Sequence, residues 1–412
     1  MDKFFNSIKF KELLKKYEEA IKNNFNCFLD ADEFTDIAEY YYINGKEDEC
    51  YEAINHALSI FPDSTSALIF SARLALFAEN DIEKAEQIAN KINDEEDIEF
   101  KFLITELYLV KNQPQKAYEY IKKQVVNIND DDIDEFIIVA ANMLLDYNFI
   151  DYTEKWLNNF NIKENNSYKE LQGKILIAKE KYREGEKVFN KLLDYNPYST
   201  EYWNWLTDIQ FLKEDFKKAL NCSEFAIAIE PDNEEAIQNK AHALFYIGNN
   251  KEALKYFVKY KKITKNKENI SNTYIKIAHI YLTINNKKEA LKNYKEAVKT
   301  STNQYTTFIH IAISLLDNGY TKFAYKLFKV NIKYMVNDEY FGYAYFARCC
   351  FELNKIDEYN DALDIAIKMN PKECIDALKD IYPENTQIED YKKIKPIKNE
   401  NISHNNSDII IL

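Results

Sequence analysis

The stretch FAIAIEPDN, at Phe225–Asn233, is an apolar helical run that ends at a proline. Three further stretches read almost the same way: HALSIFPDS at His56–Ser64, KLLDYNPYS at Lys191–Ser199 and IAIKMNPKE at Ile365–Glu373. Pro197 and Pro231 are 34 positions apart, and Pro231 and Pro371 are 140 apart, which is four steps of 35. Proline has no amide hydrogen and disfavours helix in the residue before it, so each proline ends a helix. The spacing therefore predicts a helical unit of about 34 residues that repeats along the chain.

Small residues recur at two fixed places relative to these prolines. The first place lies twelve positions upstream, as in Ala219 before Pro231 and Cys50 before Pro62. In other repeats it is taken, with or without the proline, by Ala85, Ala117, Gly185, Ala253, Ala290 and Ala324. The second place lies about twelve positions earlier again and is taken by Ala38, Ala140, Gly173, Thr207, Ala241, Ala278, Ala312 and Ala347. A bulky side chain at a crossing would hold two helices apart, so the pattern predicts tight antiparallel helix pairs.

This arrangement resembles the tetratricopeptide repeat family, in which the two helices of one unit pack against the first helix of the next. The best match is 200–233, where Trp203, Leu206, Ala219, Ala226 and Pro231 take the family's signature positions. The resemblance implies an all-α fold, a right-handed superhelical solenoid of antiparallel helix pairs covering residues 31–373. Ten units are expected to start near Ala31, Ser66, Ile98, Ile133, Asn166, Thr200, Glu234, Ser271, Tyr305 and Tyr340.

Three positions depart from the small-residue pattern. Arg73 stands where the first helix should carry a small residue, and Tyr152 and Tyr359 stand at the crossing of the second helix. Either these three units pack more loosely than the others, or the register assigned to them is wrong by one residue.

The two ends of the chain differ from its middle. Residues 1–30 are expected to form an N-terminal capping helix, because 2–24 read as one amphipathic helix, and residues 374–382 a C-terminal one. The polar, Asn- and Lys-rich stretch 383–412 is expected to be mostly disordered. Its last residues, SDIIIL, are apolar; they either dock back into a groove, serve as a ligand for another protein, or are inert.

Composition limits the kinds of partner and compartment. The net charge of −14 disfavours phosphate backbones and anionic membranes, so we expect neither nucleic-acid nor membrane binding. The N-terminus lacks the apolar core of a signal peptide, and no run approaches 18 apolar residues. The six cysteines show no framework spacing, which indicates a reducing compartment, most simply the cytoplasm.

Catalytic signatures are absent from the sequence. It contains no Gly-x-Gly-x-x-Gly, no phosphate loop, no His-Glu-x-x-His, no Gly-x-Ser-x-Gly and no Cys-x-x-Cys. Asp208, His242 and His279 take equivalent positions in successive units and form a candidate strip for a metal. Neighbouring helices pack about 8–10 Å apart whereas zinc needs ligands within about 2.1 Å, which argues against one shared ion. We therefore expect no enzyme activity, no cofactor and no metal.

The resemblance also implies which side chains face the concave groove. In the early units these are Phe70, Leu74, Phe77, Phe102, Leu109, Ile137 and Leu144, and in the middle units Lys174, Asn204, Asp208, Phe211, Gln238, His242, Phe245 and His279. Aromatic side chains supply contact area and amides supply orientation, which suits a bound peptide. The alternative is that many of these aromatic side chains pack between helices.

Chaperone-binding members of the family hold a terminal carboxylate with Lys and Asn at fixed groove positions. The first of those positions carries no lysine in any unit of this chain: it holds Thr35, Phe70, Phe102, Ile137, Glu170, Asn204, Gln238, Ile275, Ile309 and Ala344. The leading hypothesis is a non-enzymatic scaffold or adaptor that binds a partner peptide or protein segment in the groove. The alternatives are a self-assembling, homo-oligomeric scaffold, and a metal-dependent enzyme or regulator that uses Asp208, His242 and His279.

Overall fold

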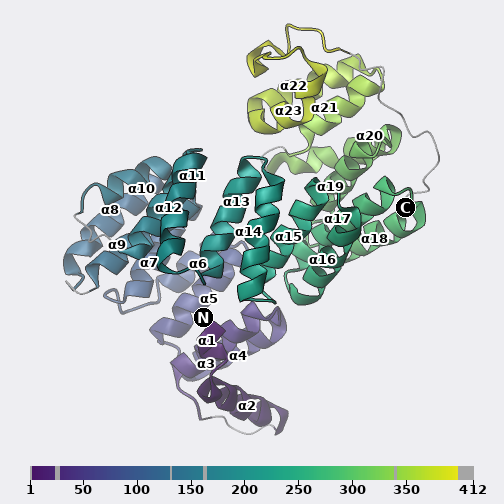
Figure 1. The fold of residues 1–412 in the computed structure, drawn as a ribbon. Helices are drawn as coiled ribbons and strands as arrows, with labels where there is room; N and C mark the ends of the chain where they lie inside the picture. The colour runs from purple at the N-terminus through teal and green to yellow at the C-terminus, as the bar shows by residue number, and fades with distance from the viewer. Residues whose placement is uncertain (1, 24–27, 130–131, 161–164, 338–340, 398–412) are drawn as a thin grey trace. The chain divides into compact units, whose positions relative to one another are not determined.

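The computed structural model describes residues 2–23, 28–129, 132–160, 165–337 and 341–397 (Figure 1). Within those ranges every regular element is an α-helix or a short 3₁₀ turn, so the all-α class is confirmed. The chain divides into two compact units, Met1–Glu214 (the N-unit) and Asp215–Leu412 (the C-unit). In each unit the helices follow one another as antiparallel pairs, as a solenoid requires.

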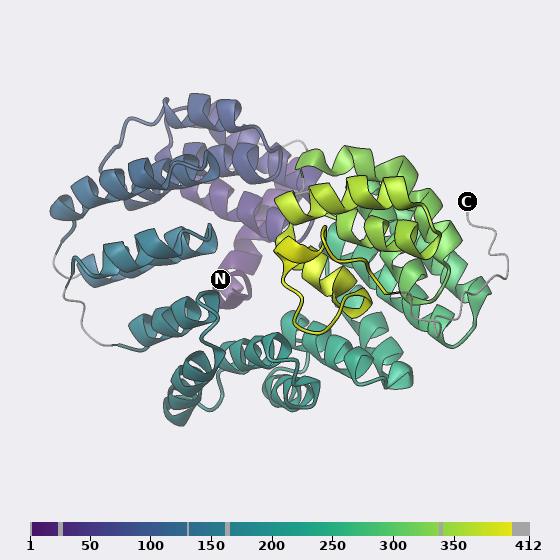
Figure 2. The same cartoon turned by 90° about the horizontal axis from the view of Figure 1, so that it is seen from above.

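The N-unit begins with a helix of four residues and one of 16 residues, and continues with paired helices, laid side by side in Figure 2. Its helices are α1 (Asp2–Phe5), α2 (Ile8–Asn23), α3 (Ala31–Ile43), α4 (Glu47–Ile60), α5 (Thr65–Phe77), α6 (Ile82–Ala89), α7 (Ile98–Val110), α8 (Pro114–Gln124), η1 (Val125–Asn127), α9 (Ile133–Asp146), α10 (Ile150–Leu157), α11 (Asn166–Ala178), α12 (Tyr182–Tyr195) and α13 (Thr200–Leu212).

The C-unit continues the pairing and ends in shorter elements. Its helices are α14 (Phe216–Ile229), α15 (Glu234–Tyr246), α16 (Asn250–Ile263), α17 (Lys267–Thr283), α18 (Lys287–Thr300), α19 (Gln304–Asp317), α20 (Thr321–Asn331), η2 (Ile332–Asn337), α21 (Tyr343–Glu352), α22 (Ile356–Met369), α23 (Pro371–Leu378), η3 (Lys379–Ile381) and η4 (Ile388–Asp390).

The small residues lie at the helix crossings, as the pattern predicted. Every alanine assigned to either series is buried, with at most 1% of its surface exposed. At the glycine of α11 the contact is closer still, because a Cβ atom on Gly173 would lie 2.7 Å from the ring of Phe189. Close backbone approach therefore holds the two helices of a repeat together.

The register was wrong by one residue at two of the three exceptions. Ala72 and Thr153 are fully buried and take the crossing positions that had been assigned to Arg73 and Tyr152. Arg73 instead points out of the crossing, where its guanidinium pairs with the Glu99 carboxylate at 2.8 Å. The third exception, Tyr359, is itself buried at the crossing.

A backbone feature marks the turn inside each repeat. One residue between the first and the second helix has a positive φ, between 54° and 80°, in all ten pairs: Gly45, Asn80, Asn112, Asn148, Glu180, Glu214, Gly248, Asn285, Gly319 and Asn354. A left-handed residue just after a helix lets its last carbonyls be satisfied before the chain reverses. Glycine adopts this conformation without steric cost and asparagine adopts it readily, so this series fits the ten-unit array.

The turn between repeats uses a side-chain cap. Ser64, Ser199 and Asn233 each follow a proline by two positions. Each accepts a hydrogen bond from a backbone N–H in the first turn of the next helix. The proline therefore ends one helix, and the residue two positions later starts the next.

The N-terminal cap consists of two helices, α1 and α2, rather than one. Phe10 and Tyr17 are the buried residues of α2, and their rings pack against those of Tyr40 at 5.3 Å and Phe34 at 5.9 Å. They cover the apolar face of the first repeat, as a terminal repeat requires.

Residues 383–397, which we expected in a disordered tail, instead pack against the last helices of the C-unit. The ring of Tyr391 stacks on Tyr382 at 4.0 Å, and the Tyr382 hydroxyl donates to the Tyr391 carbonyl at 3.0 Å. The Ile397 amide donates to the Ile381 carbonyl at 2.7 Å. Residues 398–412, with the closing SDIIIL, lie outside the described residues.

The positive-φ turns lead to a stability prediction. Gly248 has a φ of 80°, and a Cβ atom there would meet nothing within 4 Å. Gly248→Ala should lower the free energy of unfolding by about 1 kcal/mol, because an L side chain is disfavoured in this conformation. Urea unfolding followed by circular dichroism measures this difference.

The equivalent turn residue Glu180 has a φ of 59° and gives the matched test. Glu180→Gly relieves the backbone there but makes the unfolded chain more flexible, so a gain of about 0.5 kcal/mol is expected. A loss of stability in Glu180→Gly, or no loss in Gly248→Ala, would show that the turn conformation does not limit stability.

Candidate functional site

Two pockets lie against the first helices of successive repeats, one in each unit. The N-unit pocket is a cavity of about 590 Å³ lined by α3, α5 and the start of α7. The C-unit pocket is a cavity of about 470 Å³ lined by α15, α17, α19 and one residue of α21. Side chains spaced three or four positions apart on a helix share a face, so each helix contributes a row of residues to its pocket.

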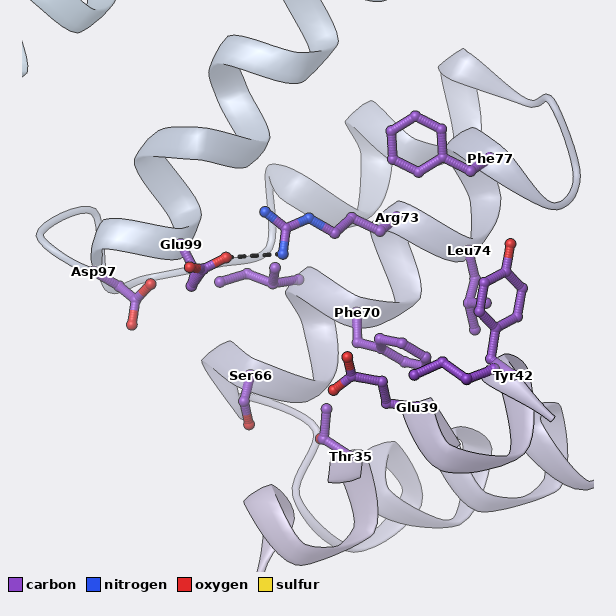
Figure 3. Close-up of a pocket in the computed structure, with 12 residues that line it drawn as sticks. Thr35, Glu39, Tyr42, Ser66, Phe70, Arg73, Leu74, Phe77, Asp97 and Glu99 are labelled. Atoms are coloured by element: carbon purple, nitrogen blue, oxygen red, sulfur yellow. Dashed lines mark hydrogen bonds and ion pairs between the residues drawn. The ribbon is translucent and has the colours of Figure 1, made fainter. Parts of the chain in front are cut away.

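The N-unit pocket is mainly apolar (Figure 3). Of its lining residues, Phe77, Ile43 and Tyr42 expose 50%, 46% and 39% of their surface. Its lining consists of Thr35, Glu39, Tyr42, Ile43, Ser66, Ile69, Phe70, Arg73, Leu74, Phe77, Asp97 and Glu99. Aromatic and aliphatic surface exposed in a concavity can accept an apolar side chain.

The single cation of the N-unit pocket is neutralised. The Arg73 guanidinium pairs with Glu99 at 2.8 Å and with Glu106 at 3.1 Å. Glu39 has no hydrogen-bond or ion-pair partner among the described residues. Burial raises the pKa of Glu39, although the charge of Arg73 opposes that shift. The pocket therefore presents an apolar floor beside one free carboxylate.

The C-unit pocket is more polar. Its lining consists of Gln238, His242, Phe245, Tyr246, Asn269, Asn272, Ile275, Lys276, His279, His310, Ile313, Ser314, Asp317 and Tyr345. Four side chains that the sequence placed in the groove meet here: Gln238, His242, Phe245 and His279. Three further lining residues were not assigned to the groove from the sequence. They are Lys276 on α17 and His310 and Asp317 on α19.

The three imidazoles of this pocket differ in their contacts. The ring of His242 meets Phe257 edge-on at 5.2 Å, and that of His279 meets Phe245 at 5.1 Å. His279 Nδ1 is 3.2 Å from the Ser314 hydroxyl. In His310 the Nδ1 atom is buried and has no hydrogen-bond partner among the described residues. One polar ring atom of the pocket, His310 Nδ1, is therefore left unsatisfied by the described residues.

Burial keeps these imidazoles neutral at neutral pH. It lowers the pKa of His242 and of His279 to about 4, and the positive charge of Lys276 acts in the same direction. The pKa of His310 is also lowered, again by burial first and Lys276 second. The ammonium group is thus close enough to influence a histidine on each of α15, α17 and α19.

The other four predicted groove residues belong to the N-unit. Lys174 on α11 pairs with Glu170 at 2.6 Å and lies 5.3 Å above the ring of Trp205. On α13, Asn204 is buried, whereas Asp208 and Phe211 are half-buried. The predicted strip is thus divided between α11 and α13 of the N-unit and the pocket of the C-unit.

The early-unit groove positions are only partly in a pocket. Phe70, Leu74 and Phe77 line the N-unit pocket. Phe102, Leu109, Ile137 and Leu144 instead belong to a buried core cluster, so their assignment to the groove was wrong. Phe102, for example, stacks on Phe136 at 5.1 Å. Here the alternative interpretation, packing between helices, holds.

No three His, Cys, Asp or Glu side chains in the described part of the chain are placed to hold a metal ion. The metal hypothesis for Asp208, His242 and His279 therefore gains no support from the geometry. None of the described helices is long and apolar enough to cross a membrane.

Comparison with known proteins agrees with the repeat geometry. Residues 271–304, which coincide with the eighth predicted unit, match the tetratricopeptide repeat family. Residues 271–304 therefore contain a tetratricopeptide repeat. A curated relative, TPR repeat-containing protein MJ1428 of Methanocaldococcus jannaschii, is 23% identical over 319 residues, which are 75% of this chain and 52% of the relative.

A second curated relative of this chain is anaphase-promoting complex subunit 7 of Dictyostelium discoideum. It is 26% identical over 254 residues, which are 59% of this chain and 40% of the relative. The chain thus spans about half, or less, of the length of these two relatives. Among solved structures, MamA is similar at 16% identity and a TM-score of 0.33, over 39% of this chain and 92% of that one.

The histidines of the C-unit pocket predict how stability depends on pH. In the unfolded chain they titrate near 6.5, whereas the pKa of His242 and His279 in the folded chain is about 4. Their contribution is fully present above pH 6.5 and is lost as the pH falls towards 4. We expect the urea concentration at the unfolding midpoint to decrease when the pH is lowered from 7 to 5. The decrease should be smaller in His242→Gln/His279→Gln than in the unsubstituted chain.

Asp317 provides a control for this prediction, because its effect on stability has the opposite dependence on pH. Burial raises its pKa to about 6, so the folded chain takes up a proton at Asp317 before the unfolded chain does. Through Asp317, stability therefore increases as the pH falls through 6 and decreases as the pH rises. Asp317→Asn should therefore steepen the loss of stability on acidification. Equal slopes in all three proteins would contradict the assignment.

Proposed function

We propose that the chain is a non-enzymatic scaffold, and that the N-unit pocket and the C-unit pocket each bind a segment of a partner protein. Tetratricopeptide repeats are protein–protein interaction modules in general. The observation that carries the proposal is the exposed apolar surface of Tyr42, Ile43 and Phe77 around a cavity of about 590 Å³. Such surface is costly in water unless a partner covers it.

The chemistry of the N-unit pocket indicates what kind of side chain it would take. An apolar anchor fits among Phe70, Leu74 and Phe77, and the free carboxylate of Glu39 faces a neighbouring position. A buried aromatic or aliphatic anchor with a charged residue next to it is the usual centre of a binding interface. We therefore expect an apolar residue of the partner to enter this pocket, with a basic residue near Glu39.

A relative supports the view that the array works inside an assembly. The Dictyostelium relative is named as a subunit of the anaphase-promoting complex, and it matches this chain over 254 residues. We propose by analogy that this chain also contributes its repeats to a larger assembly, whose other members are to be identified by capture.

The pockets can be tested by capture of partners from native extract. Proteins bound by the intact chain should be lost, or bound at least about tenfold more weakly, with Phe70→Ala/Phe77→Ala, because truncating an interface anchor typically costs 2 kcal/mol or more. The same comparison with Phe245→Ala tests the C-unit pocket. Circular dichroism checks that the variants fold.

Tyr195→Ala/Tyr198→Ala is the matched control, since both tyrosines are exposed and line neither pocket. Partners that survive the pocket variants but are lost with this control would place the interaction at the turn between α12 and α13. That result would overturn the proposal for both pockets.

A further inference from the structure

The C-unit pocket contains a lysine without a counterion. Lys276 is half-buried on α17, and no carboxylate of the described residues lies within 4.0 Å of its ammonium group. Its ammonium group lies 5.7 Å from the centroid of the Phe245 ring. Two other lysines of the C-unit do have partners, because Lys240 pairs with Glu224 at 2.8 Å and Lys259 with Asp232 at 3.2 Å.

The carboxylate of Asp317 does not take this role. It lines the same pocket and influences Lys276 electrostatically, but the two groups are more than 4.0 Å apart and form no ion pair. Burial lowers the pKa of Lys276 and outweighs the opposite effect of Asp317. The ammonium group has therefore lost part of its water without gaining a partner.

Several side chains that can donate hydrogen bonds line the same pocket as this ammonium group. His242, His279 and His310 lie on three successive first helices, and an imidazole can donate from either ring nitrogen or, once charged, from both. The amides of Gln238, Asn269 and Asn272 line the same cavity. The unpartnered His310 nitrogen shows that protein groups alone do not satisfy the cavity.

An oxyanion would satisfy both the charge and the donors. Its negative charge would pair with the ammonium group, and its oxygens would accept hydrogen bonds from several directions at once. We propose that the C-unit pocket binds a carboxylate or phosphate group of the partner segment, with Lys276 as its counterion and His242, His279 and His310 as donors. This rests on the proposed function only for the source of the anion, not for the site itself.

The site differs from the carboxylate clamp of chaperone-binding relatives. No repeat of this chain has a lysine at the first position of that clamp, which in the eighth unit is Ile275. Lys276 is the next residue, and its neighbours in the pocket are imidazoles. The ligand's anion is therefore expected to lie among side chains of α15, α17 and α19.

The five histidines of the chain make the site observable without knowing the partner. The full chain, labelled with carbon-13 in its histidine rings, is titrated with inorganic phosphate and separately with acetate, at fixed pH and ionic strength. We expect saturable shifts of the His242, His279 and His310 signals with one common midpoint, assigned through His→Gln variants. His56, on α4 of the other unit, should not share that midpoint.

Lys276→Met should weaken this response by about tenfold or more, as expected when a charge-assisted hydrogen bond is removed. Lys295→Met is the matched control, because Lys295 is an exposed lysine of α18 that does not line the pocket. If Lys276→Met does not fold, Lys276→Gln replaces it as the variant that removes the charge.

The outcomes separate the two proposals. A response to phosphate but not to acetate assigns the site to a phosphorylated side chain, and a response to both assigns it to acidic groups in general. The site is overturned if no saturable shift occurs, if His56 shifts with the same midpoint, or if Lys276→Met leaves the midpoint unchanged. A pocket that binds phosphate while Phe245→Ala retains every partner would preserve the oxyanion site and reject the C-unit pocket as the partner's site.

Discussion

The close crossing of two helices in each repeat is the constraint on which the rest of the structure depends. Its alanines are buried with almost no exposed surface, so a larger side chain would separate the helices. With the crossing fixed, the opposite face of each first helix presents residues at intervals of three or four. Phe70, Leu74 and Phe77 on α5 and Gln238, His242 and Phe245 on α15 follow that spacing. The pockets are thus a consequence of the packing behind them.

The turns impose a second constraint, which explains how an array of ten helix pairs uses only six glycines. A left-handed residue follows the first helix in every pair, and asparagine takes that place in five of the ten turns. Glu180 and Glu214 take it in two further turns. Glutamate has no intrinsic preference for this conformation, so the crossing on either side must stabilise the turn.

The sequence predicted what depends on local periodicity and missed what depends on contacts between repeats. The prolines, the small residues and the start of most first helices were found because each is set by its own helix. The register at Arg73 failed because one residue decides which side chain enters a crossing, and Ala72 stands beside it. Phe102 and Ile137 were assigned to the groove, but whether an aromatic or aliphatic residue faces solvent depends on the neighbouring repeat. Lys276 and Asp317 went unnoticed because the loss of a counterion is visible only in three dimensions.

The two pockets treat a partly buried positive charge in opposite ways. Arg73 in the N-unit is held by two carboxylates, so its desolvation is offset within the protein. Lys276 in the C-unit has no carboxylate within 4.0 Å among the described residues, and three imidazoles line the same pocket. If stability alone shaped this pocket, a methionine at 276 would fill the same volume without the cost of burying a charge. An unpaired ammonium group beside an unsatisfied imidazole nitrogen adds little to folding stability, which is what we expect of the oxyanion site proposed above.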